Sequence, residues 1–122
     1  MKGNKSSLCV RAVEYMLTRK DEEFGELTVA KIARALKVSQ SYLDRLFRLQ
    51  RNFPLREYFL REKMVRSVIL LTGESDLTIK QLSEKVGFLD CNYFIYIFKN
   101  HFGISPARYR ECKKMNRISG EK

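Results

Sequence analysis

The chain has 122 residues and a net charge of +10, from 24 Lys and Arg against 14 Asp and Glu. This length fits one compact domain or two very small subdomains that share an element. An apolar fraction of 44% is enough for a core, so the chain need not be disordered. The excess of positive charge fits a polyanionic partner, which means DNA, RNA or an anionic membrane surface.

The cysteines and the single histidine do not form a recognisable site. Cys9, Cys91 and Cys112 are odd in number and widely spaced, and His101 has no second ligand at metal spacing. We therefore expect reduced thiols, two of them packed as small apolar residues, and neither a metal nor another cofactor. No apolar run approaches the ~20 residues of a membrane span, and the polar N-terminus resembles no secretion signal. These features predict a cytoplasmic protein.

The first third of the chain predicts a helix, a loop and two short helices. Apolar residues at i, i+3, i+4, i+7 and i+8 form one face of a first helix that ends near Arg19; these residues are Cys9, Ala12, Val13, Met16 and Leu17. A polar loop of residues 21–25 follows. Thr28 is a good N-cap for the second helix, whose apolar side consists of Val29, Ile32, Ala33 and Leu36.

The chain breaks at Lys37-Val38, and Ser39 caps a third helix. The apolar side of that helix consists of Leu43, Leu46 and Phe47. Asn52 is suited to the left-handed conformation that ends a helix.

The longest predicted helix runs from Pro54 to about Thr72 and ends at Gly73. Proline is favoured in the first turn, where its missing N–H costs no hydrogen bond. At 1.5 Å per residue the helix is ~28 Å long. The residues available for burial are Tyr58, Phe59, Met64, Val65, Val68, Ile69 and Leu71.

The second half of the chain repeats the plan of the first. Thr78 caps a helix that buries Ile79, Leu82 and Val86, and Gly87 forms the turn. Asp90 caps a helix that buries Phe94, Ile97 and Phe98 and ends at Gly103. Ser105-Pro106 opens a last helix that continues to about Lys114, and the tail to Lys122 is expected to fray.

An internal repeat relates the two halves. Tyr42, Phe47, Asn52 and Tyr58 recur as Tyr93, Phe98, Gly103 and Tyr109 with the same intervals. The aromatic pairs lie 51 residues apart, whereas Thr28 and Thr78 lie 50 apart, so the second turn holds one extra residue. We predict an all-α fold of about seven helices, with two related subdomains, 1–53 and 73–122, joined by a linking helix, 54–72.

In each half, a short helix, a tight turn and a second capped helix with a polar outer face form the helix-turn-helix pattern. The first helix braces the second, whose N-terminal turns can then lie in a major groove with their side chains near the base edges. Two copies of this pattern together with the positive charge favour a protein that binds DNA.

The sequence also resembles a known family. The matching segments are Leu27-Thr-Val-Ala-Lys-Ile-Ala33, Val38-Ser-Gln-Ser-Tyr-Leu-Asp-Arg-Leu-Phe47, the helix Tyr58–Leu71, Val86-Gly-Phe-Leu-Asp-Cys-Asn-Tyr-Phe94 and Phe98-Lys-Asn-His-Phe-Gly-Ile-Ser-Pro-Ala-Arg-Tyr-Arg110. On these residues the chain is similar to the DNA-binding domain of AraC/XylS-type bacterial transcription regulators, over nearly its whole length. The resemblance implies a monomer whose two recognition helices enter successive major grooves, and the ~28 Å linking helix is of the right order for a DNA turn of ~34 Å. Family members often carry a separate ligand-sensing domain. None is present, so the chain is either a stand-alone regulator or the DNA-binding part of a longer one.

In the first recognition helix, the outward positions predicted to contact bases are Gln40, Ser41, Asp44, Arg45 and Arg48. Arg45 is the strongest candidate, because a guanidinium bonds O6 and N7 of one guanine together. The alternative is that Arg45 pairs with Asp44 or with a phosphate. Asp44 could accept from cytosine N4 or orient Arg45.

In the second recognition helix, the predicted base-contacting positions are Cys91, Asn92, Ile95 and Tyr96. Many members of the family have an arginine where Tyr96 stands and a small polar residue where Ile95 stands. Asn92 could bond adenine and Ile95 could contact a thymine methyl. Our hypothesis is that this helix contributes mainly shape and phosphate contacts, or that it offers Ile95 and Tyr96 to a protein.

The N-termini of the short bracing helices and six basic residues are predicted to contact DNA phosphates. The six residues are Arg61, Lys99, Arg108, Arg110, Lys113 and Lys114. For each of them, a solvated surface charge is the alternative.

Other classes of function have less support. The sequence has no nucleophile–base spacing and no Gly-rich phosphate loop, so we do not expect an enzyme. A long basic amphipathic helix suited to a membrane surface is also absent. The remaining alternative is a helix-turn-helix module that binds RNA polymerase or another regulator. Steep salt dependence would favour nucleic acid over such an apolar protein contact.

Overall fold

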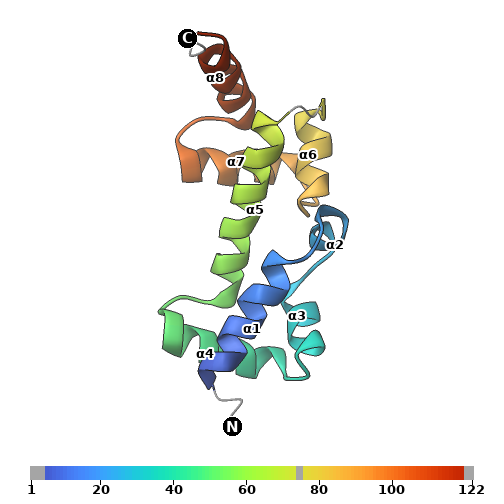
Figure 1. Cartoon of the computed structure of the whole chain (residues 1–122), viewed down its shortest axis with the longest axis vertical. Coiled ribbons are helices and arrows are strands. Elements are labelled where there is room, and N and C mark those ends of the chain that lie inside the picture. Colours follow the sequence, from blue (N-terminus) through green and yellow to red (C-terminus); the bar gives the residue numbers. More distant parts are fainter. Residues whose placement is uncertain (1–4, 74–75, 120–122) are drawn as a thin grey trace. The chain divides into compact units, whose positions relative to one another are not determined.

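The computed structural model describes residues 5–73 and 76–119. Within these ranges the chain forms eight helices and no strand, which confirms the all-α class (Figure 1). The helices are α1 (Lys5–Leu17), α2 (Asp21–Gly25), α3 (Val29–Ala35), α4 (Gln40–Arg51), α5 (Leu55–Thr72), α6 (Ile79–Lys85), α7 (Cys91–Phe102) and α8 (Pro106–Ser119). None of these described helices is both long and apolar enough to cross a membrane.

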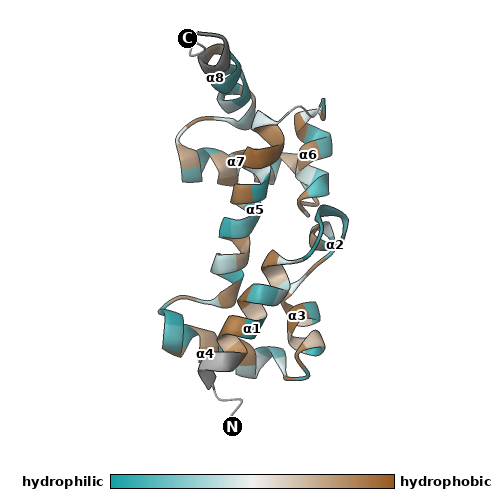
Figure 2. Ribbon diagram, viewed as in Figure 1, coloured by the Kyte–Doolittle hydropathy of each residue, from teal (hydrophilic) through white to brown (hydrophobic). Residues whose placement is uncertain are grey.

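The chain consists of two compact units, Met1–Glu62 and Lys63–Lys122, and the boundary between them falls inside α5. Unit 1 contains α1 to α4 and the first part of α5, and unit 2 contains the rest. Apolar and hydrophilic segments alternate along α4 and α5 (Figure 2). Such alternation is expected of helices that bury one face.

The core of unit 1 is formed by apolar side chains from α1 to α5. They include Cys9, Ala12, Met16, Phe24, Ile32, Leu43, Phe47, Leu55 and Phe59. Burial raises the pKa of the Cys9 thiol, and the positive charge of Arg51, which lowers this pKa, offsets only part of the effect. Because only the thiolate is nucleophilic, this thiol is a packing group rather than a reactive one.

Helix α2 replaces the polar loop that the sequence predicted at residues 21–25. Its three acidic residues lie in the first turn, where negative charge favours a helix. Phe24 is fully buried and meets Phe59 edge-on, with ring centroids 5.2 Å apart. The prediction of a loop was wrong because it was based on the polar residues of this segment and left out Phe24, its one aromatic residue.

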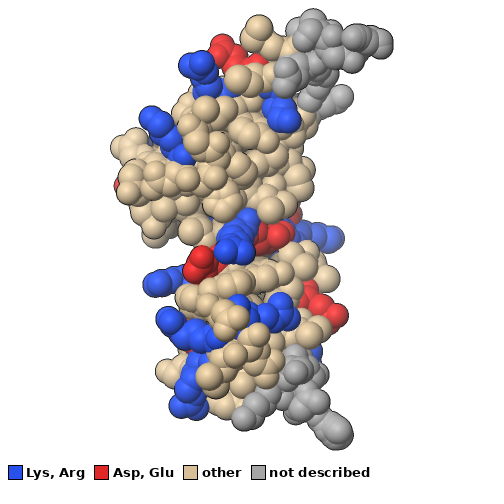
Figure 3. All heavy atoms as spheres, turned by 90° about the vertical axis from the view of Figure 1, so that its left-hand side faces the viewer, with Lys and Arg blue, Asp and Glu red and all other residues tan. Residues whose placement is uncertain are grey.

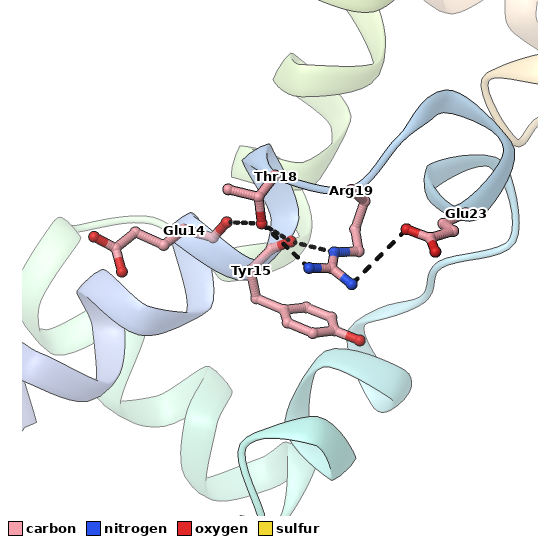
Figure 4. A network of polar contacts seen from close by, with 5 residues as sticks. All are labelled: Glu14, Tyr15, Thr18, Arg19 and Glu23. Carbon is pink, nitrogen blue, oxygen red and sulfur yellow. Dashed lines mark hydrogen bonds and ion pairs between the residues drawn. The ribbon is translucent and has the colours of Figure 1, made fainter.

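Helix α1 ends in a network of polar contacts that the sequence did not indicate (Figure 4). The Thr18 hydroxyl donates to the carbonyl of Glu14 at 2.8 Å, and Arg19 Nε donates to the carbonyl of Tyr15 at 3.0 Å. The same guanidinium lies 4.2 Å from the centroid of the Tyr15 ring and 3.8 Å from a carboxylate oxygen of Glu23. The Arg19 hydrogen bond satisfies the Tyr15 carbonyl, one of those that a helix leaves open in its last turn.

The core of unit 2 is rich in aromatic rings. Phe98 is fully buried, and its ring centroid lies 5.8 Å from Phe94, 4.5 Å from Phe102 and 5.6 Å from Tyr109. Phe88 contacts Phe94 at 5.1 Å. Such pairs stabilise a core beyond the area that they bury.

The packing also bears out the internal repeat. Phe47 meets Tyr58 edge-on at 5.8 Å in unit 1, just as Phe98 meets Tyr109 in unit 2. The residues that end α4 and α7, Asn52 and Gly103, are both left-handed, with φ of 67° and 87°. Related positions therefore perform the same structural task in both units.

Some sequence expectations about burial were wrong. Leu17, Val65 and Ile69 were expected in the core, yet they are 46%, 50% and 62% exposed, because each helix buries only part of its apolar surface. Of the three thiols, Cys9 is buried, Cys91 half-buried and Cys112 exposed, so one cysteine and not two is a core residue. Helix α8 continues past the predicted end at Lys114 to Ser119, and residues 120–122 of the predicted frayed tail lie outside the described residues.

Replacement of Gly103 by alanine is expected to lower the free energy of unfolding by about 1–2 kcal/mol, because an L-residue resists the left-handed conformation. A Cβ at this glycine would meet nothing within 4 Å, so the cost is conformational and not steric. Chemical denaturation of the wild type and the variant measures it. The matched control is Asn52→Gly, which removes the same strain in unit 1 and should not destabilise. Equal stability of wild type and Gly103→Ala would contradict the assignment.

Candidate nucleic-acid interface

The turn between α3 and α4 is tight and contains one residue with a left-handed backbone conformation. Lys37 has a φ of 63°, and the Val38 N–H donates to the carbonyl of Ala33 at 3.1 Å. Both flanking helices are capped as predicted: the Thr28 hydroxyl accepts from the Lys31 N–H, and the Ser39 hydroxyl accepts from the Tyr42 N–H. The turn therefore sets the start of α4 by local hydrogen bonds.

The turn between α6 and α7 repeats this geometry. Gly87 has a φ of 100°, and the Phe88 N–H donates to the carbonyl of Ser83 at 2.9 Å. Thr78 forms a full capping box with Gln81, and the Asp90 carboxylate accepts from the Asn92 N–H. The two turns thus follow one plan.

Leu89 is the extra residue that the sequence intervals predicted in the second turn. In the first turn Val38 directly precedes the N-cap, whereas in the second turn Leu89 stands between Phe88 and the N-cap Asp90. Leu89 is fully exposed to solvent. The repeat intervals indicated an insertion, but they gave neither its identity nor its exposure.

The predicted base-contacting residues of α4 lie on its outer side. Gln40, Ser41, Arg45 and Arg48 are exposed and Asp44 is half-buried. Asp44 forms its ion pair with Arg48, at 3.3 Å, and not with Arg45 as the sequence left open. The Arg45 guanidinium lies 6.0 Å from the centroid of the Tyr42 ring and forms no ion pair within the described residues.

The corresponding surface of α7 has a different chemistry. Asn92 and Tyr96 are exposed, whereas Cys91 and Ile95 are half-buried. The basic residues of α7 are confined to its last turn, at Lys99 and His101. The N-terminal half of α7 therefore presents amide, aromatic and apolar groups without a cation.

The predicted phosphate-contacting residues differ in how many contacts they make with the rest of the protein. Lys99, Arg108, Lys113 and Lys114 are exposed. Arg61 is exposed too, 3.7 Å from Glu57 and 4.8 Å from the centroid of the Phe53 ring. Lys and Arg side chains are spread over both units on the face shown in Figure 3, among uncharged side chains and a few acidic ones.

Arg110 is turned inward within unit 2. Its guanidinium donates to the carbonyl of Leu77 at 2.7 Å, and its second terminal nitrogen is buried. Arg110 thus fastens α8 to the chain that precedes α6. The hydrogen bond to Leu77 favours a structural role for Arg110. The phosphate contact of Arg110 stays a prediction.

Three of these basic residues share one shallow cavity of about 460 Å³ in unit 2. It is lined by Ile79, Ser105, Ala107, Arg108, Arg110, Glu111 and Lys114. The lining has three cations against one carboxylate, a balance of charge that favours an anion over a cation.

Lys63, which the sequence did not single out, supports the second turn from α5. Its ammonium donates to the carbonyl of Gly87 at 3.4 Å and lies 4.8 Å from the centroid of the Phe88 ring. Burial lowers the pKa of this ammonium. Charged and apolar residues both surround Lys63 in the sequence of α5, so the sequence alone does not indicate that this lysine contacts the second turn.

The free energy of unfolding is expected to rise with pH between the lowered pKa of folded Lys63 and the ~10.4 of an unfolded lysine. In that range the unfolded chain binds more protons than the folded one, so alkali favours the folded state. Urea denaturation at several alkaline pH values should show this rise in the wild type and a smaller one in Lys63→Met. Identical pH dependence in both proteins would contradict the burial of the ammonium.

Known proteins match the chain over most of its length. The family model described as a helix-turn-helix domain matches residues 32–111. The Msm operon regulatory protein of Streptococcus mutans is 42% identical over 87 residues, which are 71% of this chain and 31% of that protein. The match covers about a third or less of the length of these curated relatives. It covers 32% of the regulator YijO of Escherichia coli and 12% of the regulator YtdP of Bacillus subtilis.

Solved structures share the fold. A transcriptional regulator of Chromobacterium violaceum, described as containing an AraC-type DNA-binding domain, has a TM-score of 0.75 and 26% identity, over 92% of this chain and 96% of that one. The DNA-binding domain of AdpA, a global transcriptional factor in complex with a target DNA, has a TM-score of 0.69 and 20% identity, over 93% and 96%. The second likeness concerns the fold alone.

Proposed function

Since the chain belongs to the AraC-type family of helix-turn-helix proteins, we propose that it binds double-stranded DNA sequence-specifically and regulates transcription. The observation that carries this proposal is the repeated turn. In each unit a left-handed residue and a capping side chain set the start of a helix with exposed polar positions. Helices α4 and α7 are the two recognition helices, and they enter successive major grooves of one DNA molecule.

Helix α4 supplies the stronger base contacts. Arg45 is exposed and has no carboxylate partner among the described residues, so it needs to break no ion pair to reach a guanine. Arg48 must share its charge with Asp44. Gln40 and Ser41, in the first turn of α4, lie where recognition helices contact base edges.

Basic residues other than the predicted base-contacting ones hold the phosphate backbone. The cavity lined by Arg108 and Lys114 is the best candidate, because it gathers positive charge beside the N-terminal turn of α8. Lys99, Lys113 and Arg61 add exposed charge. Such contacts position a protein on DNA without reading its sequence.

One chain with two recognition helices needs no partner copy, so we expect a monomer on DNA. The proposed role places the protein in the cytoplasm, with the nucleoid. A second candidate function is a contact with RNA polymerase or another regulator, favoured by the exposed aromatic rings of Tyr93 and Tyr96, which are 53% and 62% exposed.

Selection from a pool of random duplex DNA, followed by affinity measurements at several salt concentrations, tests the proposal. We expect a bipartite motif with boxes ~10 bp apart and an affinity that falls steeply with salt. A single short box would restrict base reading to one helix. No enrichment at all would contradict the proposal and favour the protein-interaction role.

A further inference from the structure

The second recognition helix is preceded by a feature that the first one lacks. Leu89 is wholly exposed immediately before the N-cap Asp90, while its neighbour Phe88 is buried. No residue of the first turn corresponds to it, because Val38 there is half-buried and adjoins the N-cap Ser39 directly. An exposed leucine thus stands at the N-terminal edge of α7, where a recognition helix contacts bases.

The side chains that follow Leu89 restrict which bases α7 can recognise. Guanine is read by cations that donate to O6 and N7, and α7 has its basic residues only in the last turn. The exposed residue nearest Leu89 on α7 is Asn92, whose amide suits adenine N6 and N7. The other exposed residues in the first two turns of α7 are Tyr93 and Tyr96, which are both aromatic.

Apolar and amide groups together match one base pair. The thymine C5-methyl is the only apolar group that a base pair presents in the major groove, and the adenine opposite presents the pattern that an amide bonds. A leucine and an asparagine three residues apart across a helix N-cap therefore match adenine and thymine. Neither gives guanine O6 and N7 the bidentate pair of donors that an arginine supplies.

We propose that α7 reads an A·T-rich half-site, in which Leu89 packs on a thymine C5-methyl and Asn92 bonds an adenine. This inference rests on the proposed function and names what its second recognition helix recognises. The two helices then use different chemistry: α4 reads guanine through Arg45, and α7 reads methyl groups. The aliphatic contact adds specificity without adding salt dependence.

Deoxyuridine tests the inference, because it lacks only the C5-methyl of thymidine. Each contacted thymidine in the second box is replaced by deoxyuridine in the selected DNA, and affinity is measured for the full chain. We expect about a fourfold loss per contacted methyl, the effect of burying one such group. In Leu89→Ala the same replacement should have little further effect, because its partner is gone.

The matched control is Leu49→Ala, which removes another exposed leucine, 72% exposed, from α4 in unit 1. It should keep the full response to deoxyuridine in the second box. Thermal unfolding of Leu89→Ala should match the wild type, since an exposed side chain leaves no cavity.

Three results would overturn the inference. Unchanged affinity for the deoxyuridine DNA, while guanine changes in the first box still abolish binding, would refute it and leave the proposed function intact. Leu89→Ala that binds DNA normally but fails to activate or repress transcription would assign this surface to RNA polymerase. Absence of any sequence preference in the wild type would refute the proposed function itself.

Discussion

Replacement of Arg45 by alanine is expected to weaken binding to the selected DNA by about 5- to 150-fold, because a bidentate arginine–guanine contact contributes ~1–3 kcal/mol of discrimination. The loss should be confined to DNA that carries the contacted guanine, so the variant should bind the intact site and a site with that guanine replaced equally well. Affinity measurements on both DNAs at one salt concentration test this.

Two further variants separate the possible causes of that loss. Arg45→Lys keeps the charge but not the planar fork, so it should recover phosphate attraction and little of the guanine preference. Arg48→Ala removes an arginine one turn further on, which is already paired with Asp44, and should have the smaller effect. An equal loss on every DNA sequence would show that Arg45 contacts a phosphate and not a base.

Replacement of Phe98 by alanine is expected to lower the free energy of unfolding by about 3–5 kcal/mol, the usual cost of deleting a buried phenyl ring. Phe98 is fully buried and contacts Phe94, Phe102 and Tyr109, so the cavity left behind has aromatic walls on several sides. Proteins of this size are stabilised by only ~0.05–0.15 kcal/mol per residue, so the variant should be close to unfolding at room temperature.

Urea denaturation followed by circular dichroism measures this effect. Phe98→Leu, which keeps most of the apolar volume, is the control and should lose clearly less. Phe47→Ala removes the equivalent ring of unit 1 and should cost a similar amount, because Phe47 is also fully buried and packs on Tyr58. A loss below about 1 kcal/mol for Phe98→Ala would contradict the position of this ring at the centre of its core.

The starts of α3, α4, α6 and α7 could be predicted because they depend on short-range interactions. Thr28, Ser39, Thr78 and Asp90 each bond a backbone N–H two or three residues ahead, so the residues that define these caps are adjacent in the sequence. The left-handed residue Asn52 is a similar local feature. The repeat strengthened these predictions, because each half was an independent copy.

What could not be predicted depends on contacts between distant residues. Helix α2 depends on the contact of Phe24 with Phe59, 35 positions away, in addition to the acidic residues of its own first turn. Lys63 supports a turn 24 residues further along the chain. Two exposed residues of α5, Val65 and Ile69, looked like core residues because an apolar stripe is wider than the surface that a helix buries.

The sequence predicted which residues of α4 face outward, but it did not predict which of these residues pair with each other. The outward positions of α4 follow from helical spacing, once Leu43 and Phe47 are assigned to the core. Which arginine pairs with Asp44 depends on rotamers, and the i,i+4 partner Arg48 is favoured over the adjacent Arg45 because residues one turn apart share a helix face. The exposure of Leu89 follows from the conformation of the second turn, whereas the repeat intervals indicate only that one residue is inserted there.

Methylation of guanine N7 in the selected DNA, with and without saturating protein, shows whether α4 lies in the major groove, because N7 faces that groove. We expect protection of at least one guanine in the box read by α4, and loss of this protection with Arg45→Ala at concentrations that still saturate the DNA. Guanines that stay fully reactive in a saturated complex would contradict insertion of α4 into the major groove.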